Sequence, residues 1–191
     1  MSSAIEQEFE TVDLILKSGA RTKNVDAFCL TWIKFERQLR KLTGNILYQA
    51  TAFPASDRMA KEAMRAALLA KSNIKHDHFI GGIRKLTGHT MKDIIGDKHK
   101  ELRKAVNQAY VFRNKIIHGQ QTGQNLDGSL LASSQSDLRE WCEILAKEGM
   151  ARFGYDGFGR DSLRKTKRAD ITASVDKAIQ DDGWEAFVKS L

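Results

Sequence analysis

Apolar residues recur along this chain at the spacing of one helix face. The clearest run follows intervals of four, three, four and three residues and consists of Phe28, Trp32, Phe35, Leu39 and Leu42. Such spacing places all five side chains on the same face of a helix. Their size and aromatic character predict the centre of the core. Asn24 and Gly44 are suited to begin and end this helix.

The same period predicts helices along most of the chain. With one proline and few β-branched alternations, nothing in the pattern favours strands, so the predicted fold class is all-α. Thr90 with Asp93 can cap a short helical turn, and Asp97 can begin the long helix that follows. Glycines predict an irregular stretch over 73–90. The expected helices cover 3–17 with a Ser3–Glu6 capping box, 24–44, 57–71, 98–118, 136–149 and 170–191.

The chain changes character near residue 150. Residues 149–170 contain four Gly and six basic residues, a composition typical of a flexible loop. We therefore expect a helical bundle over 1–150, followed over 151–191 by a basic, Gly-rich connector and a C-terminal helical extension.

Basic residues are concentrated in the middle third of the chain. The formal net charge is +7. Residues 1–57 hold 7 basic and 7 acidic side chains, residues 58–118 hold 14 and 5, and residues 119–191 hold 10 and 12. A local excess of this kind indicates a polyanionic partner. A solvated basic helix surface is the plainer alternative.

Length and composition exclude several classes of protein. A chain of 191 residues with 41% hydrophobic content can bury a real core. No apolar run reaches the ~18 residues of a membrane span, and the acidic N-terminus does not resemble a secretory signal. Cys29 and Cys142 form no CxxC pair, which fits packed thiols in a reducing compartment. We expect a cytoplasmic protein without membrane association.

One short segment combines groups suited to phosphate chemistry. Arg113-Asn114-Lys115-Ile116-Ile117-His118-Gly119 ends the long predicted helix. Asn114 and His118 lie one turn apart on one face, and Arg113 can reach the same helix end. Cleavage of RNA without a metal needs a proton acceptor, a proton donor and a cation at the phosphate. One histidine is too few for both proton transfers, but a symmetric dimer supplies two. The alternative is an ordinary helix C-terminus, where cations and a glycine are favoured.

The segment from Arg113 to His118 resembles the R-x4-H signature of the HEPN superfamily, in its form Arg-Asn-x-x-x-His. An earlier Phe-Glu-x-x-Leu-Arg stretch over 35–40 adds to the resemblance, which covers roughly residues 24–150. It implies an all-α bundle that dimerises into a composite, metal-independent ribonuclease site, with Arg113 and His118 catalytic and Asn114 supporting them. Glu36 matches a polar residue that some members place opposite the motif, and Lys115 is a further supporting candidate.

Other motifs carry weaker signals. His76-Asp77-His78, with His89 and His99, invites a metal site, but the spacing is not that of a helical metal site, and solvent-facing histidines are the favoured interpretation. Tyr155 and Phe158 lie among basic residues, which suits either stacking on single-stranded nucleic acid or a flexible linker. The candidate RNA-binding cations are Arg103, Lys104, Arg160, Arg164, Lys165, Lys167 and Arg168.

Two hypotheses of function follow. The first is a dimeric HEPN-type endoribonuclease without cofactor or metal, acting on RNA as a toxin or anti-phage defence effector, with an antitoxin or defence-system protein as a further partner. The alternative is a non-catalytic helical module that binds nucleic acid or a partner protein, including the regulatory subunit of such a system.

Overall fold

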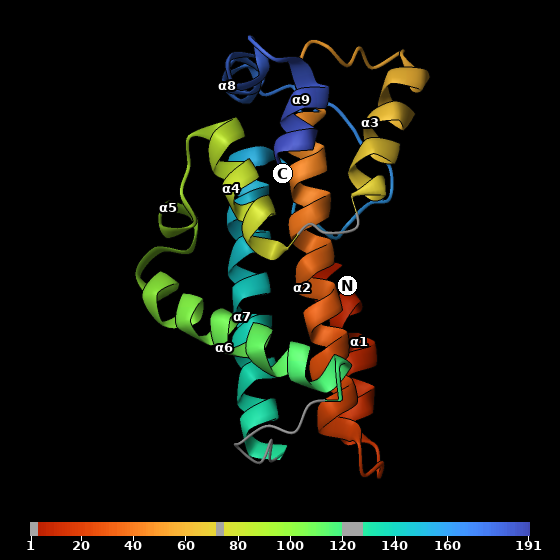
Figure 1. Cartoon of the computed structure of the whole chain (residues 1–191), viewed down its shortest axis with the longest axis vertical. Coiled ribbons are helices and arrows are strands. Elements are labelled where there is room, and N and C mark those ends of the chain that lie inside the picture. Colours follow the sequence, from red (N-terminus) through yellow and green to blue (C-terminus); the bar gives the residue numbers. More distant parts are fainter. Residues whose placement is uncertain (1–3, 72–74, 120–127) are drawn as a thin grey trace.

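The computed structural model describes residues 4–71, 75–119 and 128–191, and over these residues the chain is all-α, with no strand. Two long helices stand side by side, and a third crosses them (Figure 1). The elements are α1 (Ala4–Lys17), α2 (Lys23–Leu47), α3 (Arg58–Ala70), α4 (His76–Thr87), α5 (Met91–Ile95), the 3₁₀ turn η1 (Gly96–Lys98), α6 (His99–Ile117), α7 (Gly128–Phe153), α8 (Ala169–Ile179) and α9 (Gly183–Ser190).

The central element is α2, which packs along α7 and also contacts α1 and α4. The aromatic stripe predicted as the core is buried at every position, and the ring of Phe35 meets that of Trp141 on α7 edge to face, with centroids 6.1 Å apart. The all-α prediction and the predicted core centre are therefore confirmed. No helix of the described residues is both long and apolar enough to cross a membrane.

Two helices run through glycines that were predicted to end them. Helix α2 continues past Gly44 to Leu47, and α7 continues past Gly149. A Cβ at Gly44 would lie 3.3 Å from Leu68 Cδ1, and one at Gly149 would lie 2.8 Å from the Tyr155 carbonyl oxygen. These glycines serve close packing between elements rather than helix termination.

Several predicted boundaries shift for similar reasons. The stretch expected to be irregular over 73–90 contains α4, which incorporates Gly82 and ends at Gly88 in a left-handed conformation. A 3₁₀ turn precedes α6, so Asp97 does not cap it. Helix α7 begins before Ser136, and the single segment expected over 170–191 is two helices, α8 and α9.

Two predicted helix starts are confirmed, and in both the capping side chain lies three residues before the amide that it accepts. The Asp57 carboxylate accepts the amide of Ala60 at 2.9 Å at the start of α3. Thr90 and Asp93 form the predicted capping box at the start of α5. The Ser3 cap lies outside the described residues.

The segment expected to be a flexible connector is packed on α2. Gln38 donates to the Asp156 carbonyl at 3.0 Å, and Lys41 donates to the Phe158 carbonyl at 3.0 Å. Just past the end of α2, the Gln49 side-chain oxygen accepts the Thr166 amide at 2.8 Å. Helix α8 then packs on α4, and α9 packs on α3. The expected division at residue 150 falls inside α7, and the last forty residues cover the same central helix as the first part.

Candidate functional site

The C-terminal turns of α6 bring the three motif residues together. Arg113 Nη1 donates to Asn114 Oδ1 at 3.0 Å, and the Asn114 carbonyl accepts the backbone amide of His118 at 3.0 Å. His118 is the exposed C-cap of the helix, and Gly119 follows with a φ of 60°. The positive φ explains the glycine, because a side chain is disfavoured in this conformation at the end of a helix.

Arg113 lies against α2 beside Glu36. Burial raises the pKa of the Glu36 carboxyl, and the Arg113 guanidinium, the Trp32 indole and Arg40 oppose that rise. Arg113 is half-buried, and its Nε has no hydrogen-bond partner among the described residues. The structure thus places a cation from α6 near a carboxyl from α2. Lys115, the other supporting candidate, is also half-buried.

An aromatic cluster lies next to Arg113 and Glu36. The ring of Tyr110, one turn before Arg113, is 5.9 Å from Trp32 and 5.4 Å from His76, measured between centroids. His76 is 3% exposed, and neither ring nitrogen has a hydrogen-bond partner within the described residues. The interpretation of this histidine as solvent-facing is wrong, because α4 directs it between α2 and α6. The described residues contain no group of three or more side chains suited to hold a metal ion.

The buried His76 predicts a pH-dependent stability. Burial lowers its pKa from the ordinary value of 6.5, Asp77 opposes the shift, and Arg103, His78 and Lys75 reinforce it. Because the folded-state pKa lies below the unfolded one, the stabilisation is complete above pH 6.5 and is lost as the pH falls toward the folded-state pKa. The free energy of unfolding should therefore fall between pH 7 and 5, with this group contributing up to about 1.4 kcal/mol per pH unit.

Denaturant titrations of wild type and His76→Phe across that range measure the effect. The phenylalanine variant should lose this part of the slope, whereas His118→Ala, at the exposed end of α6, should keep it. Equal slopes in wild type and His76→Phe would contradict the assignment.

Most of the candidate RNA-binding cations have structural partners. Arg103 pairs with Asp77 at 2.6 Å. Arg160 donates to the Gly154 carbonyl at 2.6 Å, and Arg168 donates to the Ala151 carbonyl and pairs with Asp170. Lys165 donates to the carbonyls of Tyr48 and Ala50 at the end of α2, and burial lowers its pKa while Asp176 opposes the shift. These four side chains therefore bind other parts of the chain.

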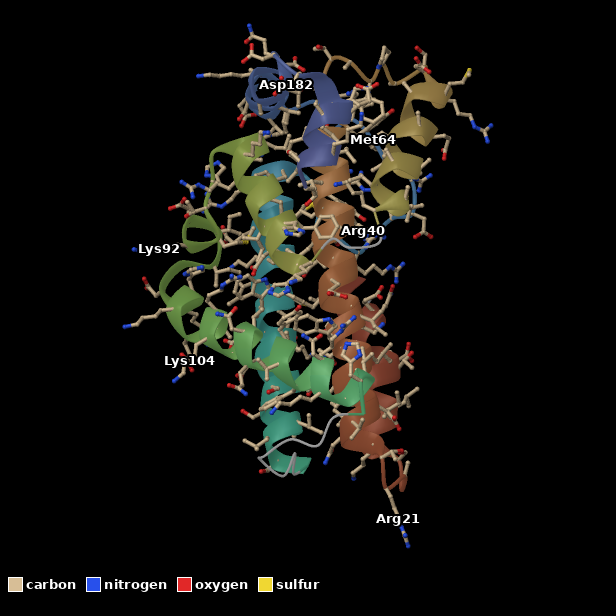
Figure 2. The ribbon with its side chains drawn as sticks, viewed as in Figure 1. Arg21, Arg40, Met64, Lys92, Lys104 and Asp182 are labelled. Atoms are coloured by element: carbon tan, nitrogen blue, oxygen red, sulfur yellow. The ribbon has the colours of Figure 1, made fainter. Side chains whose placement is uncertain are left out.

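The remaining candidates are exposed but scattered. Lys104 projects from the outer side of α6 (Figure 2). Arg164 and Lys167 lie beside the C-terminal end of α2, since Gln49 donates to the Arg164 carbonyl. Glu36 precedes Leu47, the last residue of α2, by 11 residues, which corresponds to ~17 Å at the helical rise. The structure therefore does not bring Arg164 and Lys167 to the motif.

The aromatic residues of that segment are also unavailable for stacking on bases. Tyr155 and Phe158 are 2% and 5% exposed, and Phe158 meets the ring of Phe9 edge to face. Both belong to the core, so the stacking interpretation is wrong. A hydrogen bond from the Tyr155 hydroxyl to the Arg160 carbonyl, at 3.0 Å, fixes the turn between them.

Sequence reasoning missed Tyr110 and Arg40 as neighbours of the motif. The available signal was helical register: Tyr110 is one turn from Asn114 on α6, and Arg40 is one turn from Glu36 on α2. Figure 2 shows Arg40 at the middle of the molecule, above the crossing of α6. No family model, curated protein or solved structure matches this chain.

Proposed function

We propose that the chain is a metal-independent endoribonuclease of HEPN type that acts as a homodimer, in a toxin or anti-phage defence role. One observation supports this most strongly. Arg113 and Asn114 are hydrogen-bonded to each other beside Glu36, and the exposed His118 stands one turn away at the end of the same helix.

The reaction uses these groups as follows. A neutral His118 takes the proton from a ribose 2′-hydroxyl, and the 2′-oxygen attacks the adjacent phosphorus. The bond from phosphorus to the 5′-oxygen breaks, and a second, protonated imidazole gives its proton to that oxygen. Arg113 binds the phosphate and stabilises the negative charge of the transition state. The products are a 2′,3′-cyclic phosphate and a free 5′-hydroxyl.

The second imidazole comes from a second copy of the chain. Exposed apolar side chains flank the site and support an interface there. Ile33, one turn from Glu36 on α2, is 58% exposed, and Ile117, next to His118, is 56% exposed. Two copies related by a two-fold axis through this face would each supply one His118 to a shared cleft. A partner protein of the antitoxin kind could cover the same surface.

The test is cleavage of RNA by the purified chain in EDTA, with the product ends identified. We expect cleavage that leaves 2′,3′-cyclic phosphate ends and falls by about a hundredfold or more in His118→Ala. His78→Ala removes an exposed histidine outside the motif and should cleave as wild type does. Undiminished cleavage by purified His118→Ala would overturn the proposal. Salt-dependent RNA binding without cleavage, unchanged in Arg113→Ala, would instead favour the non-catalytic binding module.

A further inference from the structure

A second concave site lies on α2, and its lining includes Arg40, one turn from Glu36. It is a pocket of about 270 Å³ between α2, α3 and the segment after α7. This volume is near the lower limit for small-molecule sites in proteins, which excludes a large ligand. Arg40 on α2 and Met64 on α3 mark its place in the upper half of the molecule (Figure 2).

The lining carries a strong excess of positive charge. The cationic set of the pocket consists of Arg37, Arg40, Lys41, Arg65 and Arg160, and Asp161 is the only acidic lining residue. Four of the five cations are guanidinium groups, which bind phosphate oxygens in pairs. A singly charged carboxylate would leave more of this charge uncompensated than a phosphate, which carries nearly two negative charges.

Most of the cationic set has hydrogen-bond partners: Arg37 pairs with Glu8 at 2.9 Å, Arg65 donates to the Asp161 carbonyl at 2.6 Å, and Lys41 and Arg160 donate to the carbonyls of Phe158 and Gly154. The one carboxylate of the lining is held only loosely. The Asp161 carboxylate lies 3.9 Å from Arg37 Nη2 and 3.7 Å from Lys41 Nζ, beyond hydrogen-bond length, and its side chain is 96% exposed. Within the described residues, Arg40 has no hydrogen bond or ion pair; it contacts the Phe79 ring at 5.3 Å and lowers the pKa of the Glu36 carboxyl. Burial lowers the pKa of Lys41, and Arg37 lowers it further. An anion at this position would relieve that repulsion.

The rest of the lining is apolar. The apolar set of the pocket is Met64, Leu68, Leu69 and Leu163. Leu69 is 68% exposed, so an apolar surface continues to the mouth of the pocket. A ligand that fits this lining should therefore have two parts, a doubly charged group for the cations and an apolar body of a few carbon atoms for the apolar set.

We propose that this pocket binds a phosphate monoester that carries a small apolar body, with the phosphate on the cationic set and the body on the apolar set. Asp161 then occupies the place of the phosphate in the free protein and is displaced on binding. The site is independent of the ribonuclease proposal, since no lining residue belongs to the Arg113–His118 motif.

Calorimetric titration of the full chain with butyl phosphate, inorganic phosphate and butanol tests the proposal. Butyl phosphate should bind about tenfold more tightly than inorganic phosphate, because its chain buries apolar surface, and butanol should not bind measurably. Arg40→Ala should weaken butyl phosphate binding by about tenfold or more. Asp161→Asn should strengthen it by removing the competing carboxylate. Arg21→Ala removes the same charge at the far end of the molecule and should change nothing (Figure 2).

Leu69→Ser serves as a second variant at an exposed position, where unfolding is not expected. It should weaken butyl phosphate and leave inorganic phosphate unchanged. Equal affinities for butyl and inorganic phosphate, or equal losses in Arg40→Ala and Arg21→Ala, would overturn the proposal.

A short RNA with and without a 5′-phosphate separates the two possible sources of the phosphate, an RNA end or a free monoester. If the 5′-phosphate increases the affinity in an Arg40-dependent way, the pocket binds strand ends. If only butyl phosphate binds, the pocket binds free monoesters.

Discussion

Arg113→Lys is expected to lower RNA cleavage by about 10²- to 10³-fold, although it keeps the positive charge. The guanidinium donates to Asn114 at 3.0 Å through one nitrogen and lies beside Glu36. Its Nε is buried, so the two terminal nitrogens remain for the phosphate. A lysine ammonium cannot bridge the amide, the carboxyl and two phosphate oxygens in one plane, because its donors sit on a single atom. The loss should appear in the rate of the chemical step.

Single-turnover cleavage of a defined RNA measures that step. Arg84→Lys, on the exposed side of α4, is the matched control and should retain the wild-type rate. Thermal unfolding of both variants checks that the fold is intact. If Arg113→Lys cleaves within about twofold of wild type while His118→Ala does not cleave, Arg113 is not the group that stabilises the transition state.

Gly157→Ala is expected to destabilise the fold by about 3 kcal/mol, which combines a strained backbone with a steric clash. Gly157 has a φ of 86°, a conformation that side chains disfavour. An added Cβ would lie 2.5 Å from Gln38 Cγ and 3.1 Å from the Gln38 carbonyl oxygen. Gln38 cannot move aside, because its amide donates to the carbonyls of both Cys142 and Asp156.

Gly88→Ala separates the two contributions. Gly88 has a φ of 74°, but a Cβ there would meet nothing within 4 Å. It should lose only about 1 kcal/mol from the backbone conformation. Urea unfolding of both variants gives the two losses in free energy of unfolding. In thermal unfolding, the Gly157 variant should have a melting temperature about 6–12 °C below that of wild type. Losses of the same size in the two variants would show that the contact with Gln38 is not tight.

The sequence predicted what depends on local pattern. The stripe from Phe28 to Leu42 identifies the core helix because burial follows helical period, and the Asp57 cap follows from chemistry within one turn. The motif residues are found together because they share two turns of α6. Their shared surroundings also follow from helical register, as Tyr110 and Arg40 show.

What the sequence could not predict depends on distant contacts. Gly44 and Gly149 look like helix ends, but each allows another element to approach closely, and only the fold distinguishes these roles. Lys165 and Arg160 look like RNA-binding cations, but they donate to backbone carbonyls. Charge along a sequence does not reveal whether a long side chain reaches solvent or the chain itself.

The attachment of the last segment to α2 also sets the time at which the protein can form. The Gln38 amide donates to the Asp156 carbonyl, 118 positions later in the chain, and the Gln49 amide donates to the Arg164 carbonyl, 115 positions later. Translation adds about 5–20 residues each second, so the partners of these two glutamines are synthesised about 5–25 seconds after the glutamines themselves. The native contacts of α2 with this segment therefore form only after residues 154–168 have been synthesised.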